Sequence, residues 1–358
     1  MNVTAAVAAK VLEFNLQLEQ IQILQIEPTS FCNAHCPHCP RFSSTGELDS
    51  NVELGHLNIG AISSNIEIEK LVNLKHIVLE GDLGDPLMHP QILEIIKFFS
   101  KAPQQPQIEL VTNGSIRNPT WWEQLASVYH NLYVTFSIDG LHDTNHLYRV
   151  GLDFNSIIKN AQSFISAGGV ARWKFIKFKH NEHQITEAIQ ISKDLGFVEF
   201  VHRPCDTARF QNLSKWPVMI NNNISHYIEP AADGSWETLA LKGKKIKNFV
   251  GSWSQHFKEI CPNLVNGHLY ISHQNLVIPC CMMHAVPRIK NKNQTHFLEM
   301  AESFEFIDLT KNKMSAVLKS KLYNHNLANS LKDQNWNSAC ENSCSSEIHR
   351  VLKYVSKI

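Results

Sequence analysis

Three cysteines near the start of the chain have the spacing of iron–sulfur cluster ligands. Cys32, Cys36 and Cys39 lie within eight residues and directly follow an apolar, strand-like segment. Three thiolates on one short loop can bind three irons of a [4Fe–4S] cluster and leave the fourth iron without a protein ligand. That open iron can bind a small chelating molecule and transfer one electron to it. A zinc site with His35 and His38 as extra ligands is the alternative, although structural zinc sites commonly contain two close pairs of ligands.

A second group of cysteines lies in the C-terminal third of the chain. Five of the nine cysteines are found there: Cys261, Cys280, Cys281, Cys340 and Cys344. Residues 266–280 alternate between apolar and polar side chains around a polar turn, which predicts a β-hairpin. Residues 314–333 have the spacing of a helix and lead to the last two cysteines. This arrangement could bring four thiolates together around a second iron–sulfur cluster or around a zinc ion.

The composition is that of a globular protein without an excess of charge. Of the 358 residues, 43% are apolar and 18% are charged, and the formal net charge is zero. This balance does not favour nucleic acid or an anionic membrane as a partner. The N-terminal segment lacks the features of a secretory signal, and no later segment is long enough to span a bilayer. We therefore expect a cytoplasmic protein, in which clustered cysteines indicate metal or catalytic sites and not disulfides.

Strand-like and helix-like segments alternate between residue 21 and about residue 200. The expected strands are 21–27, 76–81, 107–112, 132–138, 172–178 and 197–202. The clearest helix follows residue 90, because Ile92, Ile95, Ile96 and Phe99 share one helical face. Such alternation predicts parallel strands joined by right-handed crossovers, with functional loops at the carboxyl ends of the strands.

The expected fold class is therefore α/β. We predict a partial (β/α)6 barrel similar to a TIM barrel, followed by a small C-terminal subdomain made of a β-hairpin and a helix. The predicted divisions are a core domain at 1–210, a linker at 211–250 and a cluster-binding domain at 251–358.

The cysteine pattern after the first of six strands resembles that of the radical S-adenosylmethionine (SAM) superfamily. This resemblance implies that the amino and carboxylate groups of SAM chelate the open iron on the loop of Cys32, Cys36 and Cys39. Reductive cleavage of SAM would then yield a 5'-deoxyadenosyl radical that abstracts a hydrogen atom from a substrate. The resemblance also implies an electron donor such as flavodoxin or ferredoxin.

A glycine-rich segment after the second strand resembles the segment of this family that contacts the SAM ammonium group. The resemblance implies that Gly81 and Gly84 allow close approach of the backbone and that Asp85 supplies negative charge. The family more commonly has glutamate at the position of Asp85. Considered alone, the segment also fits a simple turn that leads into the next helix.

Further residues follow the later strands at family positions near SAM. The resemblance implies that Ser137 and Arg149 approach the SAM carboxylate, for which the planar fork of arginine is well suited. It also places Asn113 and Asn181 near SAM, and His38 where the family often has an aromatic residue near the adenine. Each residue has a plainer interpretation, such as a solvated arginine, a strand-end cap or a histidine that fills the cluster loop.

The C-terminal region resembles the SPASM/Twitch domains of the family, and more closely the shorter Twitch form. The resemblance implies a second, auxiliary [4Fe–4S] cluster that serves electron transfer or structure. Its ligands would be Cys261, Cys280, Cys340 and Cys344, with Cys281 as an alternative to Cys280.

Cys205 follows the sixth strand, so its thiol could face the mouth of the barrel. A thiol there could donate a hydrogen atom to a substrate radical, as in radical epimerases of this superfamily. A buried cysteine that behaves as a small apolar residue is the commoner case.

The resemblance leaves the substrate open between two classes. Relatives with these domains crosslink, epimerise or oxidise ribosomally made peptides, whereas others dehydrogenate or epimerise sugars and cyclitols. We expect a peptide substrate, with a small sugar or cyclitol metabolite as the alternative. A non-catalytic iron–sulfur or zinc scaffold is the third hypothesis.

Overall fold

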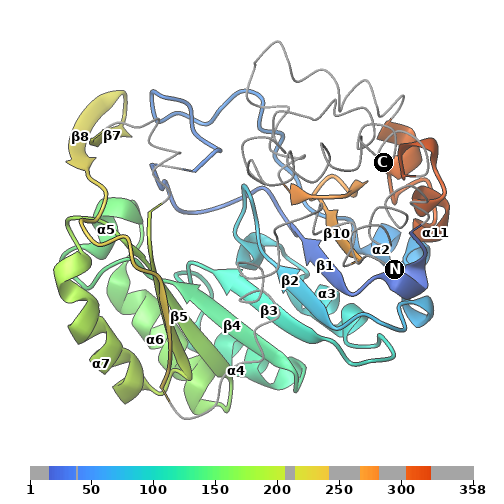
Figure 1. Ribbon diagram of the computed structural model, residues 1–358, viewed down its shortest axis with the longest axis horizontal. Coiled ribbons are helices and arrows are strands. Elements are labelled where there is room, and N and C mark those ends of the chain that lie inside the picture. The colour runs from blue at the N-terminus through green and yellow to red at the C-terminus, as the bar shows by residue number, and fades with distance from the viewer. Residues whose placement is uncertain (1–15, 38, 206–213, 242–266, 282–303, 324–358) are drawn as a thin grey trace, which may run out of the picture.

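A nine-stranded sheet forms the centre of the fold (Figure 1). The computed structural model describes residues 16–37, 39–205, 214–241, 267–281 and 304–323. The strand order is β11-β10-β1-β2-β3-β4-β5-β6-β9. The six parallel strands β1 to β6 confirm the six predicted from the sequence and the α/β fold class: β1 (Ile23–Ile26), β2 (His76–Leu79), β3 (Gln107–Thr112), β4 (Leu132–Ser137), β5 (Val170–Lys177) and β6 (Glu199–Pro204).

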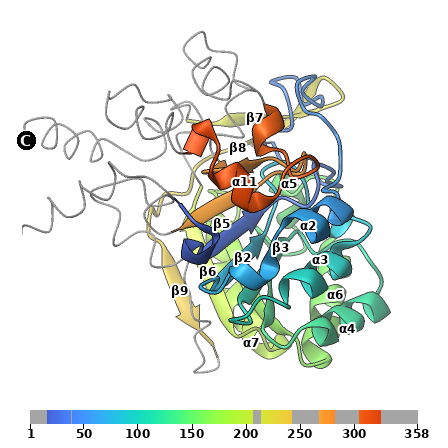
Figure 2. The ribbon, with the colours of Figure 1, turned by 90° about the vertical axis from the view of Figure 1, so that its right-hand side faces the viewer.

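Helices connect successive parallel strands and cover one face of the sheet. Figure 2 shows the longer helices on the same side of the strands. These helices are α2 (Ile59–Asn65), α3 (Ile92–Phe99), α4 (Pro119–Val128), α6 (Phe154–Ser166) and α7 (Ile185–Leu195). The remaining α-helices of the described residues are α5 (Asn145–Tyr148) and α11 (Met314–Leu318). Short 3-10 turns are η1 (Leu18–Gln20), η2 (Ile68–Lys70), η3 (Pro86–Met88), η4 (Glu182–Gln184) and η8 (Phe304–Ile307).

The local signals in the sequence explain how these helices begin and end. Asn58, Asn118 and Asp153 each accept a hydrogen bond from the first turn of the helix that follows. Gly196 ends α7 in the left-handed conformation, with φ of +93°. The predicted apolar face of α3 is confirmed, because all four of its expected residues are buried.

The predicted C-terminal hairpin is present, and it extends the core sheet. β10 (His268–Ile271) pairs in parallel with β1, and β11 (Val277–Ile278) pairs antiparallel with β10. In the turn, Ser272 N donates to Leu276 O over 3.0 Å, and Asn275 has φ of +67°. Figure 1 shows this hairpin beside β1, far from it in sequence.

Residues 214–241, which we assigned to a linker, contain three strands. β9 (Glu237–Ala240) pairs antiparallel with β6 and forms the other edge of the sheet. β7 (Trp216–Ile220) and β8 (Asn223–Ile228) form a separate two-stranded sheet. The division of the chain into domains stays a prediction.

The two faces of the central sheet differ in chemistry. On the helix side, the ring of Trp173 lies 5.5 Å from that of Phe197 and 5.8 Å from that of Phe200. On the opposite face, Arg172 forms ion pairs with Glu109 at 3.2 Å and with Glu199 at 2.9 Å. The helix side is thus an apolar core, and the inner face of the curved sheet contains buried charges.

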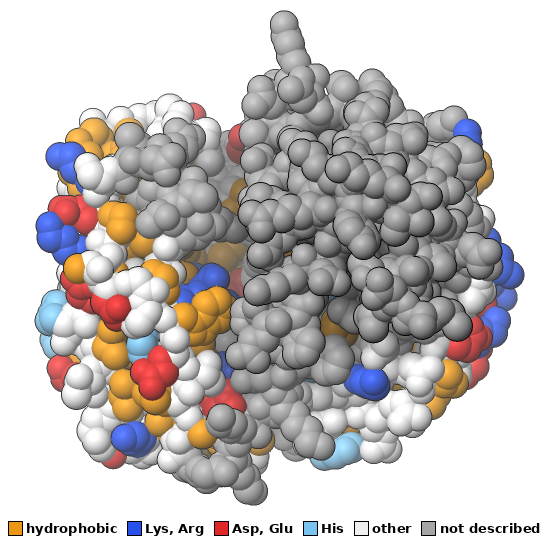
Figure 3. Space-filling model, in the orientation of Figure 1, with side chains coloured by type: hydrophobic (Ala, Val, Ile, Leu, Met, Phe, Trp, Pro, Cys, Tyr) orange, Lys and Arg blue, Asp and Glu red, His pale blue; other side chains and the backbone are white. Residues whose placement is uncertain are grey.

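The exposed surface carries charges of both signs. Figure 3 shows Lys, Arg, Asp and Glu side chains interspersed over the described part of the face that it presents. Among the described residues, no helix has the length and apolar character needed to cross a membrane.

Candidate active site at the carboxyl ends of the strands

The cysteine loop begins where β1 ends, at the edge of the sheet where the parallel strands have their carboxyl ends. Cys36 is buried, and Cys32 and Cys39 are half-buried. Cys39 N donates to Cys36 O over 3.0 Å, and Arg41 Nη1 donates to Cys32 O over 3.0 Å. These bonds fold the loop back on itself and direct a positive charge towards it.

Burial strongly affects the three thiols. It raises the pKa of Cys32 to about 11 and that of Cys39 to about 12, and it also raises the pKa of Cys36. Iron binds the thiolate form, so formation of a cluster must release protons from this loop. Arg149 favours the thiolate at Cys36, because its Nη1 lies 3.6 Å from Cys36 Sγ.

The donor set of this loop fits a cluster with one open iron. Each thiolate of such a cluster binds a different iron, so the three sulfur atoms need not meet at one point. Among the residues that the structure describes, no group of three or more His, Cys, Asp or Glu side chains could hold a metal ion. His38 lies outside the described residues, so its predicted position near the adenine stays a prediction.

The glycine-rich segment packs directly against the start of the cysteine loop. A Cβ atom on Gly84 would lie 1.7 Å from Thr29 O, and one on Gly81 would lie 2.1 Å from Gly84 O. Asp85 N donates to Phe31 O over 2.8 Å. The two glycines are therefore needed for backbone packing that brings the ends of β1 and β2 together.

Substitution of Gly84 by alanine is expected to disturb this packing. The added methyl group would overlap a backbone carbonyl, and neither β1 nor β2 can shift without breaking sheet hydrogen bonds. We expect a loss of about 1–3 kcal/mol in the free energy of unfolding and weaker SAM binding. Urea unfolding and SAM titration measure the two effects. Gly234→Ala is the control, because a Cβ atom there meets nothing within 4 Å; equal behaviour of the two variants would contradict the expectation.

The Asp85 carboxylate holds together the ends of β2 and β3. It accepts hydrogen bonds from Leu87 N over 3.0 Å, from Thr112 Oγ1 over 2.8 Å and from Asn113 N over 2.7 Å. Burial raises the pKa of Asp85, and these donors oppose that shift. The contact of Asp85 with the SAM ammonium group stays a prediction.

Asn113 lies next to the cysteine loop. Its Nδ2 donates to Asn33 Oδ1 over 2.9 Å and lies 3.9 Å from Cys32 Sγ. Ser137 is the last residue of β4 and is buried. Asn113 is therefore adjacent to the cysteine loop, and the contacts of Asn113 and Ser137 with SAM stay predictions.

Asn181 closes the turn after β5. Its Nδ2 donates to Asp139 O over 2.8 Å and to Ile176 O over 3.0 Å, and its Oδ1 accepts from Phe178 N over 2.7 Å. Both amide protons are thus used within the protein. Its predicted place near SAM is not tested by these contacts.

Arg149 connects the end of β4 to the cysteine loop. Its Nε donates to Asp139 Oδ2 over 2.6 Å, and Asp139 is fully buried. Asp139 Oδ1 also accepts from Ile176 N over 2.6 Å. Asp139 was missed in the sequence analysis; its signal is an acidic residue at the end of an otherwise apolar strand.

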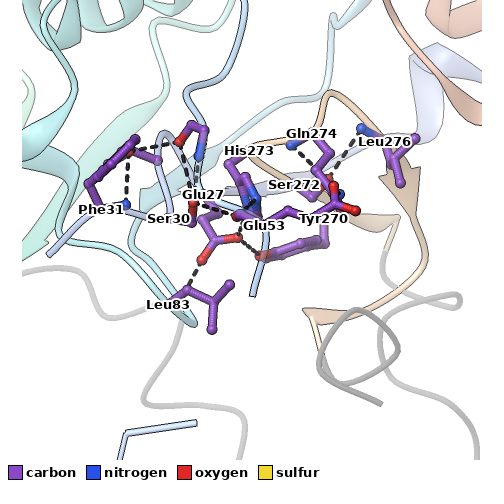
Figure 4. A network of polar contacts seen from close by, with 12 residues as sticks. Glu27, Ser30, Phe31, Glu53, Leu83, Tyr270, Ser272, His273, Gln274 and Leu276 are labelled. Atoms are coloured by element: carbon purple, nitrogen blue, oxygen red, sulfur yellow. Dashed lines mark hydrogen bonds and ion pairs between the residues drawn. The ribbon is translucent and has the colours of Figure 1, made fainter. Parts of the chain in front are cut away.

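Glu27 is a second residue that the sequence analysis missed. It follows β1 and accepts hydrogen bonds from Leu83 N over 2.7 Å, Tyr270 OH over 3.1 Å and His273 Nδ1 over 2.8 Å (Figure 4). Glu27 therefore joins the glycine-rich segment and the C-terminal hairpin at the start of the cysteine loop. The signal was again one carboxylate at the end of an apolar strand.

The remaining cysteines are placed only in part. Cys205 follows β6, is buried in the apolar core, and its N donates to Lys177 O over 3.2 Å. Cys280 and Cys281 are half-buried at the end of β11, and contact with Cys280, together with burial, raises the pKa of Cys281. The other three predicted ligands of the auxiliary cluster, Cys261, Cys340 and Cys344, lie outside the described residues.

Comparison with protein families identifies the family of this chain. The family model described as "Radical SAM superfamily" matches residues 26–203, which contain the cysteine loop, the glycine-rich segment and Arg149. The chain belongs to the radical SAM superfamily.

Among curated proteins, this radical SAM chain is similar to GTP 3',8-cyclases. It is 24% identical over 194 residues to the protein from Nostoc punctiforme and 24% identical over 182 residues to that from Trichormus variabilis. Each match covers 50% of this chain and 46% of the relative, so the chain spans about half the length of these relatives.

Solved structures show the same fold over a larger part of the chain. The crystal structure of Streptococcus suis SuiB bound to precursor peptide SuiA matches with a TM-score of 0.53 and 13% identity, over 91% of this chain and 69% of SuiB. A second SuiB structure matches with a TM-score of 0.51 and 13% identity, over 92% of this chain and 71% of SuiB. At this identity the likeness shows the fold alone.

Proposed function

We propose that the protein is a radical SAM enzyme that uses SAM and a [4Fe–4S] cluster on Cys32, Cys36 and Cys39 to abstract a hydrogen atom from a peptide. The observation that carries this proposal is the meeting of three landmarks at one edge of the sheet. Gly84 packs against the backbone before the cysteine loop, and Arg149 lies 3.6 Å from Cys36 Sγ. When bound, the cluster supplies the electron that cleaves SAM to a 5'-deoxyadenosyl radical.

The residues of the chain bind and orient SAM beside this loop. Gly81 and Gly84 allow the backbone of their segment to pack beside the cysteine loop, where Asp85 supplies negative charge for the SAM ammonium group. Ser137 and Arg149 bind its carboxylate. Asp139 holds the Nε of Arg149, so that the Nη groups stay near Cys36. Asn113, Asn181 and His38 complete the SAM site.

A second cluster would lie on Cys261, Cys280, Cys340 and Cys344. The hairpin that carries Cys280 is joined to the end of β1 through Glu27, which supports a position near the first cluster. Cys205 would donate a hydrogen atom to the substrate radical. A flavodoxin or a ferredoxin would supply electrons.

The peptide substrate is supported by the fold likeness to SuiB, a protein whose structure was solved with its precursor peptide. That likeness extends over 91% of this chain. The reaction on the peptide would be a crosslink, an epimerisation or an oxidation.

Anaerobic reconstitution tests the proposal. The protein is loaded with iron and sulfide, its metals are counted, and 5'-deoxyadenosine is measured after addition of SAM and dithionite. We expect about eight irons per chain and formation of 5'-deoxyadenosine. Stoichiometric zinc without SAM cleavage would contradict the proposal and favour a scaffold.

The substrate class is tested by adding candidates to the reconstituted protein. A small precursor peptide encoded beside the gene should increase the rate of 5'-deoxyadenosine formation and change its own mass. Stimulation by an aminocyclitol or a sugar, with no effect of the peptide, would contradict a peptide substrate.

A further inference from the structure

Lys174 on β5 and Arg203 on β6 lie on the inner face of the curved sheet. The register pairs Lys174 with Val201 and Ile176 with Arg203, so both cations share one face with Arg172. The alternate residues Trp173 and Phe175 are fully buried in the aromatic core below the helices. The two positive charges therefore point into the barrel and away from the helices.

Lys174 and Arg203 interact electrostatically with a carboxylate from the other side of the barrel. Glu80 follows β2, yet its charge interacts with both Lys174 and Arg203. β3 and β4 separate β2 from β5 in the sheet, so these side chains interact across the concave face. Gln25 Nε2 donates to Glu80 Oε1 over 2.7 Å and holds that carboxylate in place.

Of the three cations on this face, Arg172 is paired with carboxylates, whereas Lys174 and Arg203 are not paired with any carboxylate in the described part of the chain. Within the described residues, the side chains of Lys174 and Arg203 form no hydrogen bond or ion pair, and Arg203 Nε is buried without a partner. Glu80 is the carboxylate that interacts with both cations. Arg172, deeper in the barrel, is instead paired with two carboxylates. Glu109 also interacts with Lys174 but forms no ion pair with it. A buried cation without a directly paired carboxylate is costly, so this site favours a bound anion.

The site lies close to the cysteine loop. The charge of Lys174 also interacts with that of Arg149, whose Nη1 contacts Cys36 Sγ. Burial and the charge of Arg203 lower the pKa of Lys174. An anion bound here would oppose this shift in pKa, because it offsets the repulsion between the two cations.

We propose that Lys174 and Arg203 bind a carboxylate of the substrate, such as a glutamate or aspartate side chain of a peptide. This inference rests on the proposed function and names a chemical feature of its substrate. The fork of Arg203 can bind both carboxylate oxygens, and Lys174 adds a single charged donor. A carboxylate anchored here places the neighbouring atoms of the substrate beside the cysteine loop.

Peptide binding to the reconstituted, SAM-loaded protein tests this inference. The probes are the capped tripeptide N-acetyl-Gly-Glu-Gly-amide and its glutamine counterpart, compared by calorimetric titration. We expect wild type to bind the glutamate peptide about ten-fold more tightly, as charge-assisted hydrogen bonds suggest. In Lys174→Gln and Arg203→Gln the ratio of the two affinities should fall to about one. Lys179→Gln is the matched control, because Lys179 is exposed and paired with Glu229; it should keep the wild-type ratio.

Several results would overturn the inference. They are no measurable binding of the glutamate peptide to wild type, equal binding of both peptides to wild type, or an unchanged ratio in both glutamine variants. A loss of SAM affinity with an unchanged ratio would assign the cations to the SAM carboxylate. If a glutamine variant does not fold, Lys174→Arg and Arg203→Lys keep the charge and should keep a preference for the glutamate peptide. The proposed function fails separately, through absence of 5'-deoxyadenosine, and peptide binding remains measurable in that case.

Discussion

Simultaneous replacement of Cys32, Cys36 and Cys39 by alanine is expected to abolish formation of 5'-deoxyadenosine. Without these thiolates the loop has no ligand for the cluster that would hold and reduce SAM. The iron content after reconstitution should fall from about eight to about four per chain, because the auxiliary cluster has its own ligands. Chromatography of the nucleoside and iron analysis measure the two effects.

The control for this variant is Ser44→Ala. Ser44 belongs to the same loop and is exposed. Ser44→Ala should therefore retain both the iron content and the SAM cleavage of wild type. SAM cleavage by the triple cysteine variant would refute the assigned loop, and loss of all iron would show that the second cluster depends on the first.

Replacement of Arg172 by methionine is expected to cause the largest loss of stability. Arg172 Nη1 lies 3.2 Å from Glu109 and its Nε lies 2.9 Å from Glu199, and all three residues are buried. Methionine keeps much of the volume but leaves two buried carboxylates without their cation. The expected loss in the free energy of unfolding is about 3–5 kcal/mol, measured by urea unfolding of the metal-free protein.

The loss of stability in Arg172→Met should depend on pH, because the pKa of Glu109 is shifted in the folded protein. Burial acts to raise its pKa, but His76, Arg172, Thr135 and Tyr133 outweigh burial and lower it to about 2. Glu109 therefore stabilises the fold above the carboxyl pKa of the unfolded chain, about 4.3, and this contribution is lost as the pH falls towards 2. The difference between wild type and Arg172→Met should accordingly shrink over that range.

Two further variants complete this test. Glu199→Gln combined with Arg172→Met should recover part of the lost stability, because it removes one of the uncompensated charges. Lys179→Gln removes an exposed ion pair with Glu229 and should cost no more than about 1 kcal/mol. A similar loss in Lys179→Gln and Arg172→Met would contradict the importance of the buried network.

Local patterns in the sequence were sufficient to predict the parallel strands. Each of the strands β1 to β5 is a short apolar segment followed by an amphipathic helix, and the period and length of the apolar pattern distinguish strand from helix. The position of the hairpin formed by β10 and β11 could not be predicted, because its pairing with β1 joins residues that are more than two hundred positions apart. The antiparallel edge strand β9 was missed because it has only four residues and is mostly exposed, so no apolar pattern indicates it.

The parts of the candidate site that could be predicted are those whose residue types and spacing already indicate a function. The spacing of the cysteines and the glycines after β2 identified the loop and the segment that the structure brings together. Glu27 and Asp139 were missed, because their importance comes from partners contributed by other strands. The hydrogen bonds of Asn181 with Phe178 and Ile176 could not be predicted from the sequence either.

The pairing of β1 with β10 has a consequence for biosynthesis. The strand that covers the outer edge of β1 is made more than two hundred residues after β1. Until then the nascent chain presents an uncovered strand edge, which other chains can pair with. The cysteine loop also lacks part of its support until then, because Glu27, at the start of the loop, is held by His273 and Tyr270. We therefore expect insertion of the first cluster to follow synthesis of the hairpin.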